Sequence, residues 1–206
     1  PYGSLKPHTV ELMEQTGGVL ARLTKALVNF EHTALARDLK WHPMRPHWAM
    51  AHISLLQNEK LEPFIKHIFQ YFENECESEL LCLNRTAIHC DGNDYNLLAQ
   101  PSLTGPYCSG VIDFGDMTRA PAICDLATAA AYLGLGQRRP LDMLCALVRG
   151  YHNVHPFSTG ELALLYPLLL TRLAVSVVNA AIMKQHSPDD PYVTITEAPA
   201  LDFLSQ

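Results

Sequence analysis

Three polar residues near the middle of the 206-residue chain have the side chains that a phosphoryl-transfer site needs. Asp91 stands five residues before Asn96 on a polar loop, and Asp113 follows at the end of a short apolar run. Phosphoryl transfer requires a carboxylate at the acceptor hydroxyl and hard oxygen ligands for Mg²⁺. The spacing therefore predicts that Asp91 orients the acceptor and accepts its proton, while Asn96 and Asp113 bind Mg²⁺.

A β-hairpin is expected to bring the two predicted metal ligands together. Asn96–Ala99 and Gly110–Asp113 have strand-like sequences, and the proline- and glycine-containing run 101–107 between them is typical of a turn. An alternative is that Asp and Asn are frequent here only because they favour turns. The run Ile112-Asp113-Phe114-Gly115-Asp116 after the second strand favours the site.

Other polar residues near this loop are expected to support the site or to contact a substrate. We expect the ring of His89 to bond the loop backbone, and Asp116 to join the metal shell or hold the loop. Asp125 lies between apolar neighbours, so we expect it to be buried and bonded to backbone N–H groups of the loop. Asp94 either attracts a cationic substrate or forms a local turn.

Two residues outside the loop are further candidates for substrate contacts. Arg172 lies among Leu and Val on an apolar helix and needs a partner when buried. The alternatives are an ion pair with Asp91 or Asp113, a substrate carboxylate, or a purely structural ion pair. Trp41 either stacks on a cationic amine or packs within a long connection.

Apolar residues at helical spacing predict a mainly α domain around the hairpin. The expected helices are Thr9–Asn29, Ala34–Leu39, Ala49–Leu56, Glu62–Leu83, Ala122–Leu133, Leu141–Val154 and Glu161–His186, with a terminal turn at Ala200–Leu204. Thr86–His89 is expected to be a short strand or turn. We interpret residues 1–206 as a single domain with a catalytic loop at 88–98, a metal-binding hairpin at 96–116 and a helical subdomain at 121–206.

Composition narrows the classes of partner and compartment. Hydrophobic residues make up 48% of the chain and charged residues 17%, enough for a buried core. The net charge of −6 argues against a nucleic-acid partner. The apolar stretch Leu162–Ala181 is interrupted by Pro167, Arg172 and Asn179, which favours a buried helix over a membrane span. Six cysteines without a C-x-x-C pair are typical of a reducing, cytoplasmic compartment.

Three motifs of the chain resemble the aminoglycoside phosphotransferase and choline kinase-like superfamily. That family's loop reads roughly His-Gly-Asp-x-x-x-x-Asn, followed by Ile-Asp-Phe/Trp-x-Asp and Pro-x-x-x-Asp-Leu-Ala. The matching residues here are His89-Cys90-Asp91 with Asn96, Ile112–Asp116, and Pro121–Ala127. The Asn93-Asp94 dipeptide and the run 110–117 look most similar to the hydroxylysine kinase type.

The resemblance implies the C-terminal lobe of a protein-kinase-like fold. It also implies ATP or GTP as phosphoryl donor, Mg²⁺, and a small amino-alcohol such as hydroxylysine as acceptor. By resemblance Asp91 is the catalytic aspartate, and Asn96 and Asp113 bind the metal and its nucleotide. Some relatives are fused to aminotransferase-like domains in longer proteins.

The chain departs from the family pattern in the loop and in its extent. Cys90 stands where glycine is usual, and Gly92 stands where the subfamily tends to have a bulky residue, so a shifted loop geometry is possible. No glycine-rich loop with a strand-borne lysine is recognisable, and the chain starts at Pro1 without methionine, which suggests a fragment without its N-terminal lobe. We therefore expect little kinase activity from the chain alone. The alternative is a catalytically inactive, pseudokinase-like lobe that serves as a scaffold; a magnesium-dependent phosphohydrolase is favoured less.

Overall fold

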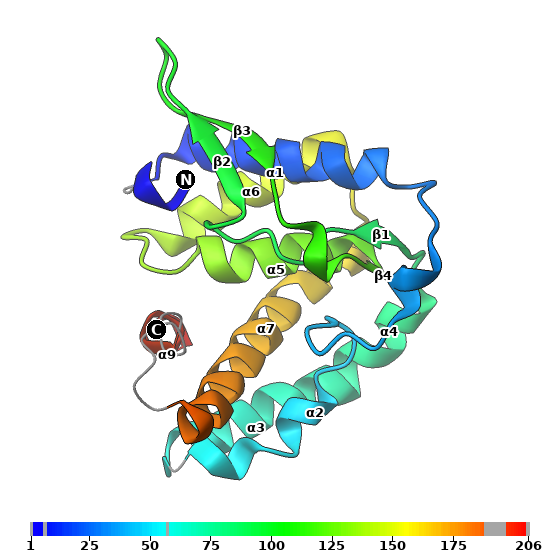
Figure 1. Cartoon of the computed structure of the whole chain (residues 1–206), viewed down its shortest axis with the longest axis vertical. Coiled ribbons are helices and arrows are strands. Elements are labelled where there is room, and N and C mark those ends of the chain that lie inside the picture. Colours follow the sequence, from blue (N-terminus) through cyan, green and yellow to red (C-terminus); the bar gives the residue numbers. More distant parts are fainter. Residues whose placement is uncertain (1, 6–7, 57, 188–196, 205–206) are drawn as a thin grey trace.

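The structure, a computed structural model, describes residues 2–5, 8–56, 58–187 and 197–204. Helices form most of it, together with two two-stranded sheets (Figure 1). The α-helices are α1 (Val10–Ala26), α2 (His47–Met50), α3 (Leu61–Tyr71), α4 (Glu77–Cys82), α5 (Ala122–Leu133), α6 (Pro140–Val154), α7 (Thr159–His186) and α9 (Glu197–Leu204). The shorter helical turns are η1 (Tyr2–Leu5), η2 (Thr33–Ala36), η3 (Ile53–Leu56), η4 (Phe72–Cys76) and η5 (Phe114–Asp116). The predicted mainly α fold with a small hairpin is confirmed.

Helices α1 and α6 lie side by side at backbone contact (Figure 1). A Cβ atom on Gly17 would lie 2.0 Å from the carbonyl oxygen of Leu147, and one on Gly150 would lie 1.8 Å from that of Glu14. Both positions therefore exclude any larger side chain. The side chain of Thr9 accepts a hydrogen bond from the N–H of Leu12 and so caps α1. The helix begins at Val10, one residue after the predicted start.

Helices α5 and α7 form the centre of the core. Almost every residue of α5 is buried, because its Ala-rich sequence lets neighbouring elements approach from all sides. Ser158 and Glu161 form a capping box that begins α7. Among the described residues, α7 is the one helix with the length and hydropathy of a membrane span, and 61% of its most apolar stretch is buried inside the protein.

The helix predicted over Glu62–Leu83 consists of three parts. A π-helical turn, η4, separates α3 from α4, and it keeps Phe72, Cys76 and Leu80 on the buried side. The single helix predicted over Ala49–Leu56 was also wrong, since α2 and η3 are separate short turns there. At the C-terminus a helix, α9, replaces the predicted terminal turn.

The strands next to the candidate site form two antiparallel pairs, of which only one was predicted. β2 (Leu97–Gln100) pairs antiparallel with β3 (Tyr107–Val111), so the predicted hairpin is present. Its second strand ends before Asp113, because that residue takes a left-handed conformation (φ 61°) that interrupts extended backbone. β1 (Thr86–Ile88) pairs with β4 (Thr118–Ala120), a strand that was not predicted. This second pair joins the start of the catalytic loop to the end of the metal-binding segment.

Candidate active site

The carboxylate of Asp91 is held from two sides within the loop between β1 and β2. Its Oδ1 accepts a hydrogen bond from Asn93 Nδ2 at 2.9 Å, and its Oδ2 accepts one from Asn96 Nδ2 at 2.6 Å. Asn96 Nδ2 also donates to the backbone carbonyl of Asp91 at 3.0 Å. Asp91 is half-buried, so its oriented oxygens remain open to a ligand. A carboxylate in this position can accept a proton from an acceptor hydroxyl.

His89 connects the catalytic loop to the end of the hairpin. Its Nε2 donates to the carbonyl of Ile112 at 3.0 Å, and its Nδ1 accepts the backbone N–H of Asp91 at 3.3 Å. The ring also contacts Phe114 edge-on, with centroids 5.0 Å apart. Both ring nitrogens are occupied by backbone groups, so His89 orients Asp91 rather than contacting a substrate.

Cys90 has an unusual backbone conformation that a buried aspartate holds in place. Its φ of 67° lies in the left-handed region, where a side chain other than glycine costs about 1 kcal/mol. Asp125, only 1% exposed, accepts the backbone N–H of Cys90 at 2.8 Å. Cysteine at the usual glycine position is thus accommodated, with its side chain fully buried. Burial raises the pKa of the Cys90 thiol to about 12, which excludes a thiolate nucleophile at neutral pH.

Asp125 belongs to a buried network that includes two helices. Its Oδ2 accepts a hydrogen bond from the hydroxyl of Thr24 on α1 at 3.2 Å, and Thr24 also bonds the hydroxyl of Tyr151 on α6 at 2.8 Å. Burial raises the pKa of Asp125, and its hydrogen bonds oppose that rise. Thr24 and Tyr151 were not predicted, because nothing in their local sequence distinguishes them from core residues.

Gly92, the second departure from the family pattern, lies in a tightly packed position. A Cβ atom there would lie 3.2 Å from the Cβ of Ala129 and 3.4 Å from a methyl group of Leu20. A bulky residue therefore would not fit between α1 and α5 at this point without moving one of them.

Asp113 lies after β3 on an exposed turn. Its Oδ1 accepts the backbone N–H of Gly115 at 3.1 Å. The N–H of Ile112 donates to the backbone carbonyl of Asn96 at 2.9 Å. This bond joins one predicted metal ligand, Asn96, to the residue directly before the other, Asp113. Arg37 reaches this turn from the connection after α1 and donates to the carbonyl of Gly115. No local pattern around Arg37 predicted this contact.

The oxygen atoms available at the site suit Mg²⁺ held jointly with a nucleotide. Asn96 uses its amide nitrogen on Asp91, and its Oδ1 accepts no hydrogen bond from the residues that the structure describes, so this oxygen is available to a cation. Within the described ranges no group of three His, Cys, Asp or Glu residues could hold a metal. Mg²⁺ is usually bound by one or two protein oxygens, with phosphate and water completing its shell. Asn96 and Asp113 therefore fit this ion together with a bound nucleotide.

Asp116 and Asp94 have different surroundings. Burial raises the pKa of Asp116, the nearby charge of Asp91 raises it further, and Arg172 and Arg37 oppose the rise. Asp116 thus lies within the electrostatic field of Asp91. Asp94 lies against the N-terminal turn η1, where its carbonyl accepts the N–H of Gly3 at 3.2 Å.

Arg172 on α7 is the cation nearest to Asp91. Its Nη2 lies 3.8 Å from Asp91 Oδ1, which selects Asp91 over Asp113 among the predicted carboxylate partners. Its Nε donates to the hydroxyl of Tyr132 at 3.0 Å, and its Nη1 donates to the carbonyl of Trp41 at 3.1 Å. The guanidinium also lies 4.7 Å from the centre of the Trp41 ring.

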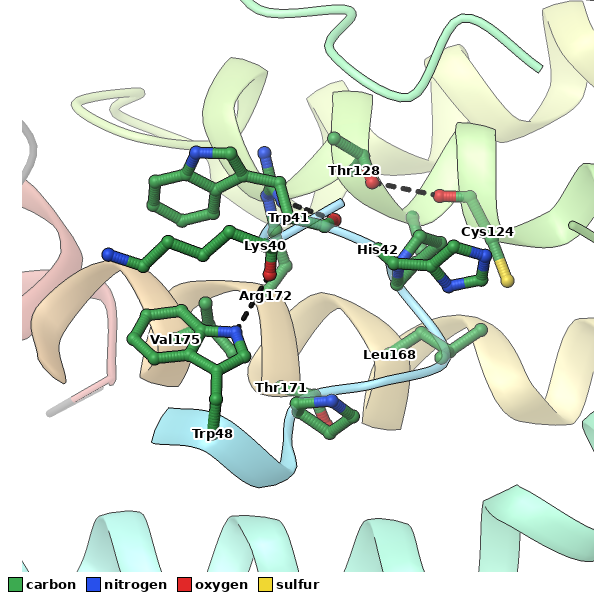
Figure 2. A pocket seen from close by; sticks show the side chains of 13 residues that line it. Lys40, Trp41, His42, Trp48, Cys124, Thr128, Leu168, Thr171, Arg172 and Val175 are labelled. Carbon is green, nitrogen blue, oxygen red and sulfur yellow. Dashed lines mark hydrogen bonds between the residues drawn. The ribbon is translucent and has the colours of Figure 1, made fainter. Parts of the chain in front are cut away.

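The pocket beside Arg172 is lined by the connection after α1 and by helices α5 and α7 (Figure 2). Trp41, Trp48 and Lys40 gather there, and the indole N–H of Trp48 donates to the carbonyl of Lys40 at 2.7 Å. The cavity holds about 20 Å³, room for roughly one water molecule. In this structure the cation on the Trp41 ring is therefore Arg172, and the tryptophan packs within the connection.

A helical lobe with an Asp-x-x-x-x-Asn loop and a following acidic turn defines a kinase-like small-molecule phosphotransferase fold. Residues 3–164 match the sequence profile of the phosphotransferase enzyme family, which is more than half of the chain. The chain belongs to this family, and the predicted resemblance and lobe fold are confirmed.

Several curated relatives carry the name hydroxylysine kinase. The chain is 26% identical over 202 residues to the protein from Danio rerio and 25% identical over 202 residues to that from Mus musculus. These alignments cover 95% and 93% of this chain, but only 57% and 54% of the relatives. The chain therefore spans a little over half the length of the curated relatives that it matches.

Two solved structures share the fold at low sequence identity. One is amicoumacin kinase hAmiN in complex with AMP-PNP, Ca²⁺ and Ami, with a TM-score of 0.59 and 9% identity. The other is a microcompartment-associated aminopropanol kinase, with a TM-score of 0.57 and 17% identity. They cover 95% and 94% of this chain, and the chain covers 59% and 60% of them.

Proposed function

We propose that the protein containing this chain transfers a phosphoryl group from ATP or GTP to the hydroxyl of a small amino-alcohol such as hydroxylysine. The observation that carries the proposal is the Asp91 carboxylate, oriented by Asn93 and Asn96 and adjacent to Arg172. The names of the relatives and of one structural neighbour, the aminopropanol kinase, support this class of acceptor.

In the proposed reaction Asp91 accepts the proton of the acceptor hydroxyl as that oxygen bonds to the terminal phosphorus of the nucleotide. The bond from this phosphorus to the bridging oxygen breaks, and the nucleoside diphosphate leaves. Asn96 and Asp113 would hold Mg²⁺, which neutralises charge on the phosphate oxygens. His89 keeps the backbone of Asp91 in register with the hairpin. Most of the rate enhancement would come from positioning and charge neutralisation.

The acidic surroundings of the loop suit an acceptor with an ammonium group. The charge of Asp91 adds to the effect of burial in raising the pKa of Asp116, and Asp94 lies on the same loop as Asp91. We extend the proposal to a cytoplasmic enzyme, with an N-terminal lobe or a fused domain in the full protein that supplies the remaining phosphate contacts.

The decisive experiment measures Mg²⁺-dependent binding of ATP and of GTP by calorimetry. It compares the full-length protein, this chain alone, and the full-length Asp113→Asn variant. We expect binding by the full-length protein, weak binding by the chain, and loss in the variant. A screen of amino-alcohol acceptors with the full-length protein then tests transfer. Binding without transfer to any acceptor would favour the scaffold alternative, and phosphate release without an acceptor would favour a hydrolase.

A further inference from the structure

Arg172 has an unused hydrogen-bond donor beside the proposed catalytic carboxylate. Its Nε and Nη1 donate to neutral oxygens, the hydroxyl of Tyr132 and the carbonyl of Trp41. Its Nη2 has no hydrogen-bond acceptor within range among the described residues, because Asp91 Oδ1 at 3.8 Å is beyond hydrogen-bond length. A buried guanidinium is stabilised when an anionic partner bonds it, so this arrangement leaves a place for one.

The side chain of Arg172 is only 7% exposed, but it lines the pocket between the connection after α1 and helices α5 and α7. The carboxylate that it faces, Asp91, is 21% exposed. A ligand that approaches Asp91 from solvent therefore comes close to Arg172 Nη2.

The guanidinium is also fixed before any ligand binds. It lies between the rings of Trp41 and Tyr132, at 4.7 Å and 5.4 Å from their centres, in addition to its two hydrogen bonds. A planar, preorganised fork of this kind matches the geometry of a carboxylate and loses little conformational entropy on binding.

The two oxygens of Asp91 separate an acceptor side from a nucleotide side. Oδ2 bonds Asn96, one of the two proposed metal ligands, whereas Oδ1 faces Arg172. A group bound at Arg172 Nη2 would therefore lie across Asp91 from the metal. This position suits part of the acceptor better than a phosphate of the nucleotide.

We infer that Arg172 binds a carboxylate of the acceptor, so the preferred acceptor is a hydroxylated amino acid rather than a simple amino-alcohol. The inference rests on the proposed function of the same site. An acceptor with both charges is complementary to the site, since its carboxylate meets Arg172 and its ammonium meets the surrounding aspartates. An acceptor with the ammonium but no carboxylate would leave Nη2 of Arg172 without a hydrogen-bond acceptor among the described residues.

The test compares hydroxylysine with the hydroxylated diamine that its decarboxylation gives. The kcat/KM of each is measured for the full-length protein and for Arg172→Met and Arg172→Lys, with Arg149→Met as a matched control. Arg149 pairs with Glu14 on the exposed surface between α1 and α6. We expect the preference for the acid over the diamine to fall about 10- to 100-fold in Arg172→Met and less in Arg172→Lys, and to stay constant in the control.

Equal losses for both acceptors would overturn the inference. They would assign Arg172 to the nucleotide phosphoryl group, a case that also raises the KM for the nucleotide, or to folding alone. Thermal unfolding identifies a variant that does not fold. If Arg172→Met does not fold, Arg172→Lys and Tyr132→Phe decide. Tyr132→Phe keeps the guanidinium and removes its Nε partner, together with the hydrogen bond between the hydroxyls of Tyr132 and Ser176. Its expected effect is a selective loss of about threefold for the acid.

Calorimetry without nucleotide separates this inference from the proposed function. Lysine and its decarboxylated diamine have the same charged groups as the two acceptors but no hydroxyl to phosphorylate. Tighter binding of lysine, lost in Arg172→Met, supports the carboxylate site even when no transfer occurs. Transfer to hydroxylysine with no preference for lysine over the diamine contradicts the carboxylate site and leaves the proposed function intact.

Discussion

The catalytic loop and the metal-binding turn differ in how the rest of the chain holds them. Asp91 is bonded by two asparagines, faces Arg172, and lies beside a residue whose backbone is held by the buried Asp125. Asp113 is exposed, and its carboxylate bonds only the N–H of Gly115 among the described residues. The half of the site proposed to accept the proton is therefore held by several contacts within this lobe, whereas the turn proposed to bind the metal is held by few among the described residues.

Replacing Asp91 should have the largest effect. Asp91→Asn in the full-length protein is expected to lower kcat by about 10³-fold, because the amide cannot accept the acceptor proton. The amide keeps the size of the carboxylate, but its NH₂ group cannot accept the hydrogen bond from Asn93 or Asn96, so the thermal unfolding midpoint should fall modestly. Steady-state kinetics and calorimetric nucleotide binding measure the two effects. An unaltered kcat would contradict the assignment of Asp91.

Residues that hold the catalytic loop should contribute more to the free energy of unfolding than residues of the metal-binding turn. Asp125→Ala is expected to lower the free energy of unfolding by about 3 kcal/mol, because the buried N–H of Cys90 loses its acceptor and the hydroxyl of Thr24 loses one of its partners. Asp113→Asn, which keeps a residue that tolerates the left-handed conformation, should change it by less than about 0.5 kcal/mol. Urea unfolding of both variants measures the difference. Equal effects of the two substitutions would contradict the difference between the catalytic loop and the metal-binding turn.

The buried carboxylate also makes stability depend on pH. Because the folded pKa of Asp125 is raised by burial, the folded state binds its proton more tightly than the unfolded chain does. This contribution is present below the unfolded pKa, about 3.9, and is lost as pH rises through the folded pKa. Relative to Asp125→Asn, the wild-type free energy of unfolding should fall over that interval. A parallel pH dependence of the two proteins would contradict the raised pKa.

The labelling rates of single cysteines should show the smallest effect, and each rate reports on one segment of the chain. Cys82 and Cys145 are exposed and should react first at about pH 8. Cys108, on the hairpin and 6% exposed, should follow. Cys90 should react later than Cys108, since Cys90 is fully buried, burial raises its pKa to about 12 and its loop is anchored to Asp125. Mass spectrometry of timed samples measures the order, and early labelling of Cys90 would show that the catalytic loop opens readily.

Features set by residues near one another in the chain were predictable from sequence. The spacing of Asp91, Asn96 and Asp113 identified the candidate site and the family. Apolar periodicity predicted α5 without error and the ends of α6 and α7 to within two residues. These predictions are correct because helix formation and loop composition depend on neighbours a few positions away in the chain.

Features that join distant segments were decided only by the tertiary structure. The β1–β4 pair, the bond from Cys90 to Asp125 and the choice of Asp91 as the carboxylate facing Arg172 all depend on how helices and strands pack. The sequence by itself determined that this protein has a phosphotransferase-type loop on a helical lobe. Only packing decided which donors surround Asp91 and that Nη2 of Arg172 faces Asp91 without a hydrogen-bond acceptor among the described residues. The reason is that a buried charge takes its partners from whichever elements meet it, whatever their separation along the chain.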